Sequence, residues 1–456
     1  MSNLKINMNN IEDVKKSLDS KTLRVCVIGI GRIGLPTALS FAKSGLQTVG
    51  VDINEHLVQN INSGNFPLKD EPGYAEIFDE VLEKQTFSAT TKIEEAVPNS
   101  DLILLSLPTP MDKNNIPDYS ALKNVGYELS KILSPQSLVI VESTIEPGFI
   151  EDEMVSLISQ SGRLKIKDDF IIGVCPENAN PGEILHDFTN LPRLVGGIDH
   201  NVTKIIKIIY DYVFSVDLIE MPDCKTANAV KLTTNVFRDI NIAFVSELSI
   251  MFEKLDIDTM KVLEAAQKKY NFQVHYPGSG VGGPCLPINS YQLLNTAKRT
   301  GVKLNIIESG RKINESMPDH VIELLFDAFR ECKKPLENSN ILILGVSYKP
   351  NVKDIQLSPA EDIINKLKKL NTKIHIYDPF FSSMEVFDFK VEENLERLLP
   401  KMDGVVIVTG HDDFKKIPLS SFTKMETPIL IDTRGIIDPV SAIEKNIIFR
   451  GLGRGK

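Results

Sequence analysis

The stretch from Leu23 to Ile53 limits the fold more than any other part of the sequence. It reads as an apolar strand (LRVCVIG), a glycine-rich turn, a helix (LPTALSFAKSG) and a second apolar strand (TVGVDI). Parallel strands joined by a helix are buried on both faces of a sheet, so both runs are almost wholly apolar. Similar runs follow at DLILLSL, SLVIVES and FIIGVC. We therefore predict a doubly wound α/β domain over residues 21–222.

Residues 225–252 form a segment of different character. They contain no Pro or Gly and keep apolar residues at helical spacing, which predicts one helix of roughly 28 residues, about 40 Å long. A helix of this length is typical of a domain connector or a dimer interface. We expect residues 223–330 to be a helical section that serves both dimerisation and catalysis.

A second α/β pattern begins at Ile341, with NILILGVSYKP, DIINKLKKL, KIHIYDP, DGVVIVTG and PILIDTRG in order. It repeats the strand-then-helix pattern of the first domain but lacks its glycine motif. We predict a polar lead-in over residues 1–20 and a second Rossmann-like domain over residues 331–456. The predicted fold class is therefore α/β, with two Rossmann-like doubly wound domains joined by a long central helix or helical domain.

Composition excludes several classes of protein. A net charge of -10 argues against partners that need cationic patches, namely nucleic acids and acidic membranes. No apolar stretch approaches the roughly 20 residues of a membrane span, and the first residues lack the apolar core of a secretory signal. The five cysteines form no CxxC pair and the seven histidines no HExxH motif. We expect a soluble cytoplasmic protein without a metal site.

The glycine motif points to a dinucleotide. Gly29, Gly31 and Gly34 follow the first strand and open the helix, where they permit a tight turn and close approach of the backbone to a pyrophosphate. Asp52 ends the second strand, 18 residues after Gly34. A carboxylate at this place suits the ribose diol and repels a 2′-phosphate, so the motif favours NAD over NADP.

A second glycine-rich segment, PGSGVGGPCLP, presents Cys285 on a sharply bent loop. A thiol on such a loop is a candidate nucleophile, although a structural turn with an incidental cysteine has the same pattern. The long helix carries Lys231 and Asn235 one turn apart, so that an ammonium and an amide share a face. Such a pair could stabilise an oxyanion, but a solvated lysine on a helix would look the same.

These motifs belong to a longer ordered series. It comprises VIGIGRIGLP, GNFPLKDEPG, LPTPMD, VESTIEPG, CPENANPGE, KLTTNVFRDINIAFVSEL, GVGGPCLP, YKPNVKDIQLSP and IDTRG, and it covers nearly the whole chain after residue 20. In this order the motifs resemble the UDP-glucose/GDP-mannose dehydrogenase family of nucleotide-sugar 6-dehydrogenases. The resemblance implies a four-electron oxidation of a sugar CH2OH to a carboxylate with two NAD. The partners expected are a UDP-sugar substrate and a second copy of the chain, bound through the central helix.

The resemblance also implies roles for individual residues. Cys285 would form a thiohemiacetal and then a thioester, Lys231 and Asn235 would stabilise oxyanions, and Glu177 would act as acid or base beside Thr144. The catalytic set is completed by Asn289. The implied cofactor contacts are Gly29, Gly31, Arg32, Ile33, Gly34, Asp52, Pro108, Thr109 and Thr144. The implied substrate contacts are Glu177, Lys231, Asn235, Tyr276, Gly278, Gly282, Lys349 and Arg434. For Lys349 and Arg434, plain surface ion pairs are an open alternative.

Three positions depart from the family pattern. Asn289 stands where the family commonly has Asp, Asn178 where many members have Arg, and Gln356 where an Arg often precedes Ser-Pro. Because an amide cannot take up a proton, Asn289 cannot share in base chemistry as an aspartate would. We expect thioester hydrolysis that is slower or that uses another base.

Several functions remain open on sequence alone. ESTIEPG, RDINIA and GVGGPC resemble the branch that acts on UDP-N-acetylhexosamines, with UDP-N-acetyl-D-mannosamine favoured, more than the UDP-glucose branch. A two-electron β-hydroxyacid dehydrogenase would use a helix Lys and Asn but would need neither Cys285 nor a second α/β domain. A nucleotide-sugar or NAD-binding protein that has lost turnover is the third alternative.

Overall fold

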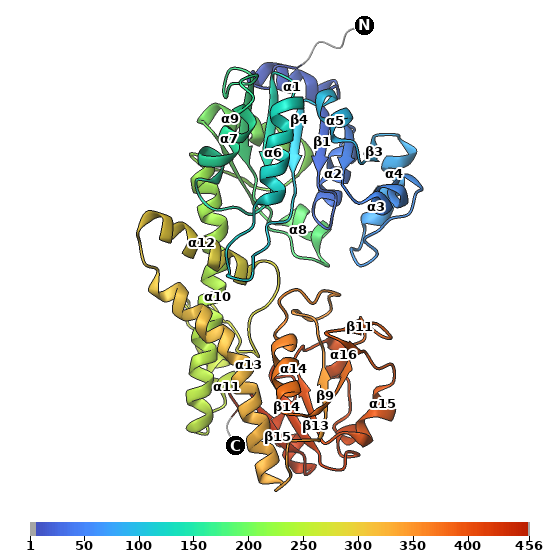
Figure 1. The fold of residues 1–456 in the computed structure, drawn as a ribbon, viewed down its shortest axis with the longest axis vertical. Helices are drawn as coiled ribbons and strands as arrows, with labels where there is room; N and C mark the ends of the chain where they lie inside the picture. Colours follow the sequence, from blue (N-terminus) through green and yellow to red (C-terminus); the bar gives the residue numbers. More distant parts are fainter. Residues whose placement is uncertain (1–5, 455–456) are drawn as a thin grey trace. The chain divides into compact units, whose positions relative to one another are not determined.

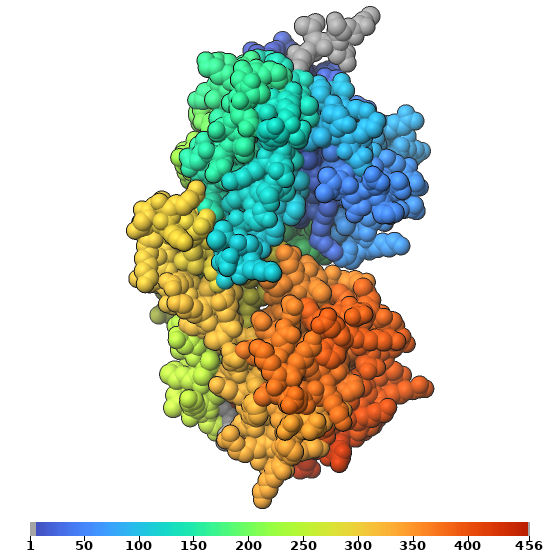
Figure 2. Space-filling view, viewed as in Figure 1, coloured from blue at the N-terminus to red at the C-terminus, as the bar shows by residue number. Residues whose placement is uncertain are grey.

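The computed structural model describes residues 6–454 (Figure 1), and Figure 2 shows the same view with all side chains. The chain divides into two compact units. The first comprises Met1–Thr234 and Tyr291–Thr296, and the second comprises Asn235–Ser290 and Ala297–Lys456. Two helices, α10 (Cys224–Lys254) and α12 (Leu286–Thr300), contribute residues to both units.

The first unit is built on one eight-stranded sheet in the order β3-β2-β1-β4-β5-β6-β7-β8. Its strands are β1 (Arg24–Ile28), β2 (Gln47–Val51), β3 (Phe87–Thr90), β4 (Leu102–Leu105), β5 (Ser137–Val141), β6 (Phe170–Val174), β7 (Arg193–Gly197) and β8 (Leu218–Glu220). The first six are parallel, and β7 runs antiparallel to β6. The order of strands reverses between β1 and β4, which is where α/β sheets bind dinucleotides. The doubly wound prediction is confirmed.

Helices cover both faces of this sheet. Val25 and Val27 of β1 face the core beneath α2 (Gly34–Lys43), α4 (Tyr74–Glu83) and α9 (His200–Val213). Cys26 and Ile28 face the opposite core, beneath α6 (Ser120–Ile132) and α7 (Val155–Ser159). Burial on both faces explains the continuous apolar runs. The shorter helices are α3 (Glu55–Asn62), α5 (Ile93–Ala96), η1 (Val97–Asn99), η2 (Ile150–Met154) and α8 (Ile184–Asn190).

The lead-in is more ordered than its polar composition suggests. Residues 1–5 of this predicted segment lie outside the described residues, but Ile11–Asp19 form helix α1. The Asn10 side chain caps the helix by accepting from the backbone N–H groups of Glu12 and Asp13. Val14 and Leu18 lie one turn apart and are buried in the core that includes α9. The polar lead-in therefore contains, in this part, a capped and packed helix.

The second unit contains a five-stranded parallel sheet in the order β10-β9-β13-β14-β15. Its strands are β9 (Asn340–Leu344), β10 (Lys373–Tyr377), β13 (Gly404–Ile407), β14 (Ile429–Asp432) and β15 (Ile448–Gly451). One core lies under α13 (Asn305–Glu331) and α14 (Pro359–Lys369). The opposite core lies under α15 (Leu395–Leu398), α16 (Asp412–Lys415), α17 (Leu419–Phe422) and α18 (Pro439–Glu444). The second Rossmann-like fold is confirmed.

The remaining elements are helical or short. Helix α10 confirms the prediction of one long helix over residues 225–252 and extends it slightly at both ends. The other elements are α11 (Thr259–Ala266), η3 (Leu399–Lys401) and the hairpin of β11 (Glu385–Val386) and β12 (Phe389–Lys390). Within residues 6–454, no helix has both the length and the apolar character needed to cross a bilayer.

Candidate active site

The turn after β1 leaves room for a pyrophosphate. Gly29 has a φ of +88°, and a Cβ on Gly34 would lie 1.8 Å from the Gly29 carbonyl oxygen, so both positions require glycine. A Cβ on Gly31 would meet nothing within 4 Å, which shows open space beside the exposed backbone of the turn. Ile33 precedes α2 without capping it through its side chain. The residues present therefore fit an anionic group at the start of α2.

Asp52 is held beside this turn. Its Oδ2 accepts from the Ile30 N–H at 3.1 Å, and its Oδ1 accepts from the Asn54 N–H at 2.9 Å. The side chain is only half-buried, and each carboxylate oxygen can accept more than one hydrogen bond. Asp52 is thus oriented at the end of β2 with acceptor capacity left for the hydroxyls of a ribose, as predicted for NAD.

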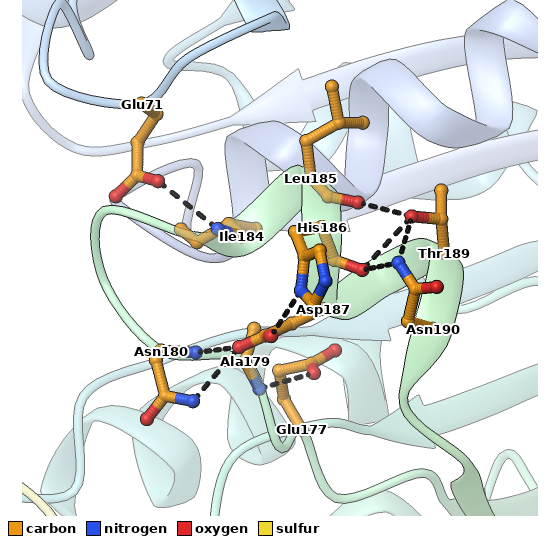
Figure 3. Close-up of polar contacts among 10 residues, drawn as sticks. All are labelled: Glu71, Glu177, Ala179, Asn180, Ile184, Leu185, His186, Asp187, Thr189 and Asn190. Atoms are coloured by element: carbon orange, nitrogen blue, oxygen red, sulfur yellow. Dashed lines mark hydrogen bonds and ion pairs between the residues drawn. The ribbon is translucent and has the colours of Figure 1, made fainter.

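Arg32 has protein partners that the sequence motif does not reveal. Its Nη2 lies 2.5 Å from Asp70 Oδ2, and its Nη1 lies 2.6 Å from the Oε1 of the buried Glu71. Glu71 also accepts from the backbone N–H groups of Gly182, at 2.8 Å, and Ile184, at 3.3 Å (Figure 3). One buried carboxylate therefore ties the glycine turn to the loop that carries Glu177. Whether Arg32 contacts the cofactor stays a prediction.

The two oxygens of Glu177 have different partners. Oε1 accepts from the Asn178 N–H at 2.6 Å and from the Ala179 N–H at 2.8 Å, and the second contact is drawn in Figure 3. Oε2 forms an ion pair with Arg193, 2.9 Å from its Nη1. Lys231 on α10 donates to the Asn178 Oδ1 at 3.0 Å. The first unit thus brings the predicted Lys231 next to the loop that begins at Glu177.

Two predicted cofactor residues lie together at the carboxyl ends of β4 and β5. The Thr109 hydroxyl donates to the Thr144 carbonyl oxygen at 3.0 Å, and Gln292 Nε2 donates to the same oxygen at 3.0 Å. Pro108 is exposed beside Thr109. The α12 residue Asn295 also donates to the buried Glu146, at 2.7 Å. The middle turns of α12 are therefore fixed on the loop after β5.

In the second unit, Cys285 is an exposed free thiol immediately before α12. Its loop is shaped by glycines: Gly280 and Gly283 have φ values of +131° and +88°. A Cβ on Gly282 would lie 2.2 Å from the Leu357 carbonyl oxygen. The backbone of this loop thus lies against the segment that follows β9.

Asn235 and Asn289 form a direct contact. Asn235 Nδ2 donates to Asn289 Oδ1 at 2.5 Å, and both side chains are buried. Asn289 lies one turn after Cys285, because its N–H donates to the Cys285 carbonyl oxygen at 2.9 Å. Two residues of the predicted catalytic set, which come from α10 and α12, therefore meet one helical turn behind the thiol.

The predicted substrate residues gather around the second sheet. Arg434 follows β14 and donates from Nε to the Val408 carbonyl oxygen at 2.6 Å. Its Nη1 lies close to Gly278, because a Cβ added to Gly278 would be only 2.5 Å from it. Burial lowers the pKa of Arg434 to about 10, against the opposing effect of Asp432. Lys349 lies in the loop after β9, and Tyr276 is exposed ahead of the glycine-rich loop. The ends of β9 and β14 share the carboxyl edge of the sheet, where such folds bind ligands.

Sequence reasoning overlooked Glu71 and Arg193. Glu71 was part of the quoted GNFPLKDEPG motif, and Arg193 is a charge in front of the apolar run LVGG. A charged residue at the edge of a buried strand is rarely tolerated without a partner, and this was the available signal. Within the described residues, no cluster of three or more His, Cys, Asp or Glu side chains is arranged to hold a metal ion.

Comparison with known proteins identifies the family of this chain. Residues 23–214, 225–316 and 342–439 match the NAD binding, central and UDP binding domains of the UDP-glucose/GDP-mannose dehydrogenase family. NAD is therefore the cofactor of the first unit.

The relatives are similar along their full length. The UDP-N-acetyl-D-mannosamine dehydrogenase of Pyrococcus horikoshii is 33% identical over 95% of this chain and 100% of its own. The UDP-N-acetyl-D-glucosamine 6-dehydrogenase of Salmonella typhi is 31% identical over 87% of this chain and 91% of its own. The solved structure of the Pyrococcus horikoshii enzyme superposes with a TM-score of 0.87 at 32% identity, covering 95% of this chain and 99% of that one. This chain thus belongs to the UDP-glucose/GDP-mannose dehydrogenase family, as an NAD-dependent nucleotide-sugar dehydrogenase with a UDP-sugar as its class of substrate.

Proposed function

We propose that this protein oxidises the C6 hydroxymethyl group of a UDP-N-acetylhexosamine, with UDP-N-acetyl-D-mannosamine favoured, to the uronic acid. The observation that carries the proposal is the exposed Cys285 thiol at the start of α12, with the Asn235–Asn289 pair one turn behind it. The names of the similar proteins from Pyrococcus horikoshii and Salmonella typhi support a hexosamine substrate.

The proposed reaction uses Cys285 as a covalent nucleophile. NAD supplies the oxidising capacity by accepting two electrons in each of two rounds. After the alcohol has become an aldehyde, the Cys285 thiolate attacks the carbonyl carbon and forms a thiohemiacetal. The second oxidation turns this adduct into a thioester, and water releases the carboxylate and returns the thiol. A covalent adduct keeps the aldehyde from leaving between the two rounds.

The polar residues divide the remaining tasks. Lys231 offsets the negative charge of the alkoxide in both rounds, and Asn235 donates to the same oxygen or to a water. Glu177 takes up or returns protons, directly or through water, beside Thr144. Asn289 accepts from Asn235 and so fixes the direction of that amide, although it cannot act as a base.

The UDP-sugar is assigned to the carboxyl edge of the second sheet. Lys349 and Arg434 bind the diphosphate, and Gly278 and Gly282 allow the loop before Cys285 to lie against the protein without side chains in the way. Tyr276, exposed at the start of this loop, contacts the sugar nucleotide.

The stoichiometry of NADH release tests this function. UDP-N-acetylmannosamine, UDP-N-acetylglucosamine, UDP-glucose and GDP-mannose are each incubated with excess NAD, and two NADH are expected per molecule of the preferred UDP-N-acetylhexosamine. Preference for UDP-glucose would replace the substrate but keep the mechanism. One NADH per substrate, with Cys285→Ala still active, would indicate a two-electron dehydrogenase. Tight binding of all substrates without NADH would indicate a binding protein.

We also propose a homodimer formed through α10. Phe237, Phe244 and Met251 lie seven residues apart on this helix, and their exposed fractions are 46%, 48% and 46%. Such a spacing places three large apolar side chains in one stripe along the helix, which is typical of a helix-to-helix contact.

Light scattering after gel filtration checks this assembly. Phe244→Glu is expected to convert the dimer to a monomer. Phe326→Glu is the matched control, because Phe326 on α13 has a similar exposure of 41% but lies outside the stripe. An unchanged dimer in the first variant would refute this interface.

Finally, we propose that the protein acts in the cytoplasm. All five cysteines are free thiols, as expected in a reducing compartment where NAD is available. Cell fractionation with an antibody to the protein tests this assignment.

A further inference from the structure

Arg193, at the start of β7, is held in a fixed orientation. Its guanidinium carbon lies 4.2 Å from the ring centre of Phe188 and 4.0 Å from that of Phe214. Only 3% of the side chain is exposed. The two ring centres lie 5.6 Å from each other, so both aromatic rings contact the guanidinium from neighbouring directions. Cation–π contacts of this kind are energetically significant when the cation is desolvated, and they help to hold the guanidinium in place.

This arginine is paired with a residue of the proposed site. Its Nη1 lies 2.9 Å from Glu177 Oε2, and the Glu177 side chain is only 10% exposed. Glu177 Oε1 accepts from two backbone N–H groups, and the ion pair with Arg193 holds Oε2 in place as well. Glu177 therefore has one orientation, set by the rigid arginine on one side and by its own loop on the other.

A second carboxyl group lies in the same buried region. Glu142, at the end of β5, accepts from the Tyr210 hydroxyl at 2.6 Å through Oε1, while its buried Oε2 has no hydrogen-bond partner. Burial raises the pKa of Glu142 to about 7, in spite of the opposing effect of Arg193. Two carboxylates beside one guanidinium disfavour each other's charge, so Glu142, which has one donor against the two backbone N–H donors of Glu177, is the one expected to hold a proton.

We propose that Arg193 is a positioning residue that holds Glu177 in one orientation for proton transfer, while the neighbouring Glu142 holds a proton at and below neutral pH and does not compete for the guanidinium. This inference rests on the role of Glu177 in the proposed function. It adds two residues behind the site, neither of which needs to touch the substrate.

The titratable groups around this cluster come from six elements or their ends. They are Glu142 (β5), Cys175 (after β6), Arg193 (β7), Tyr74 (α4), Tyr210 (α9) and Lys231 (α10), with Glu71 beside Tyr74. Burial raises the pKa of Cys175 to about 12 and that of the two tyrosines further, so these three stay neutral around pH 7. Glu142 is thus the group of this cluster expected to change charge near neutral pH.

Steady-state kinetics across pH 5–9 test the proposal. In Arg193→Met, kcat is expected to fall by about 30-fold or more while the KM for NAD changes less than about twofold. The loss is expected in kcat rather than in KM, because a displaced Glu177 carboxylate impairs proton transfer and not cofactor binding. Arg193→Lys keeps the charge but not the planar guanidinium, and an intermediate loss of kcat is expected.

Glu142→Gln tests the protonation of Glu142 most directly, because glutamine is a neutral isostere of the protonated side chain. Its kcat is expected within about threefold of the unmodified enzyme at pH 7. A loss as large as that of Arg193→Met would overturn the assignment of a neutral Glu142. Arg24→Met is the control, since it removes an ion pair with Asp101 in the same sheet away from Glu177. An unchanged profile in both Arg193 variants would overturn the role of Arg193.

Two further measurements separate this inference from the proposed function. If Glu177→Gln turns over normally, the role of Glu177 in the reaction is wrong; if it is slow while Arg193→Met is not, only the role of Arg193 is wrong. A crystal structure of Arg193→Met, or of Arg193→Lys if the former does not fold, tests positioning without any substrate. The Glu177 carboxylate is expected to leave its place, and an undisturbed carboxylate would refute the proposal.

Discussion

In the first unit Gly29 follows β1, and in the second unit Gly345 follows β9; both glycines have a positive φ, +88° and +85°. In both units the next backbone N–H donates to an aspartate at the end of the neighbouring strand. Ile30 donates to Asp52 at 3.1 Å, and Val346 donates to Asp378 at 2.8 Å. The two sheets therefore build the same local structure from different sequences.

The surroundings of the two aspartates differ. Asp52 is half-buried, whereas Asp378 is completely buried and lies 3.1 Å from His411 Nε2. Because His411 Nδ1 accepts from the Asn351 N–H at 2.9 Å, Nε2 carries the proton that is donated to Asp378. In the second unit, His411 thus occupies an acceptor of Asp378, whereas in the first unit Asp52 keeps acceptor capacity for the hydroxyls of a ribose.

Of the substitutions considered, Asp378→Ala should have the largest effect, a loss of stability in the second unit. The substitution leaves the N–H groups of Val346 and His411 without acceptors in a buried place, and each stranded group costs about 1–3 kcal/mol. We expect the second unit to lose about 4 kcal/mol of local stability, measured by hydrogen exchange of β9 and β13. NAD affinity of the first unit should stay the same, and a parallel loss of NAD binding would show that the two aspartates are not independent.

The pH dependence of the first unit should show a second large effect. Burial raises the pKa of Glu142 from 4.5 to about 7, so the folded state holds a proton that the unfolded state releases. Stability is therefore fully present below pH 4.5 and falls by about 3 kcal/mol as the pH rises to 7. Hydrogen exchange of β5 at pH 5 and pH 8 measures the loss, and Glu142→Gln should abolish it.

Asp52→Ala should affect binding rather than folding. A hydrogen bond to a charged group contributes about 1.5–3 kcal/mol, so NAD should bind about 10- to 150-fold more weakly. The preference for NAD over NADP should fall as well, because the repulsion of the 2′-phosphate disappears. Fluorescence titration with each dinucleotide checks both effects. Asp52→Asn, which keeps the acceptor of one oxygen, should lie between the variant and the unmodified enzyme.

Asp70→Asn should have the smallest effect. Its pair with Arg32 is partly exposed, at 43% and 31%, and pairs of this kind contribute about 0–1 kcal/mol. In the second unit the corresponding stretch has Ser347, whose hydroxyl donates to the Val352 carbonyl oxygen at 2.6 Å and needs no charge. We expect NAD affinity in 0.15 M salt to change by less than about fivefold. A larger change would mean that Asp70 orders the turn itself.

The sequence was sufficient for features that depend on residues near each other along the chain. The apolar runs predicted β1, β2, β4, β5 and β6, and the absence of Pro and Gly predicted α10, because burial on both sheet faces and helical periodicity leave a direct pattern. Helix α1 was underestimated because only Val14 and Leu18 mark its buried face.

Features that depend on distant residues could not be predicted in this way. Glu71 contacts Gly182, more than a hundred positions away, and no local pattern announces this hydrogen bond. The His411–Asp378 pair likewise depends on the packing of two strand ends. Roles carried by such contacts, including that of Arg193, came only from the folded chain.

The docking of Tyr291–Thr296 has a practical consequence for the modularity of this enzyme. These residues belong to the first unit, where Asn295 and Thr296 donate to the buried Glu146 and Gln292 to the Thr144 carbonyl. A gene fragment that stops at Thr234 would encode every strand of the dinucleotide fold and still lack these donors. Domain swaps among relatives that cut the chain once will therefore leave the acidic side chain of Glu146 without these donors, whereas chimeras that also carry over this short helical insert should remain soluble and bind NAD.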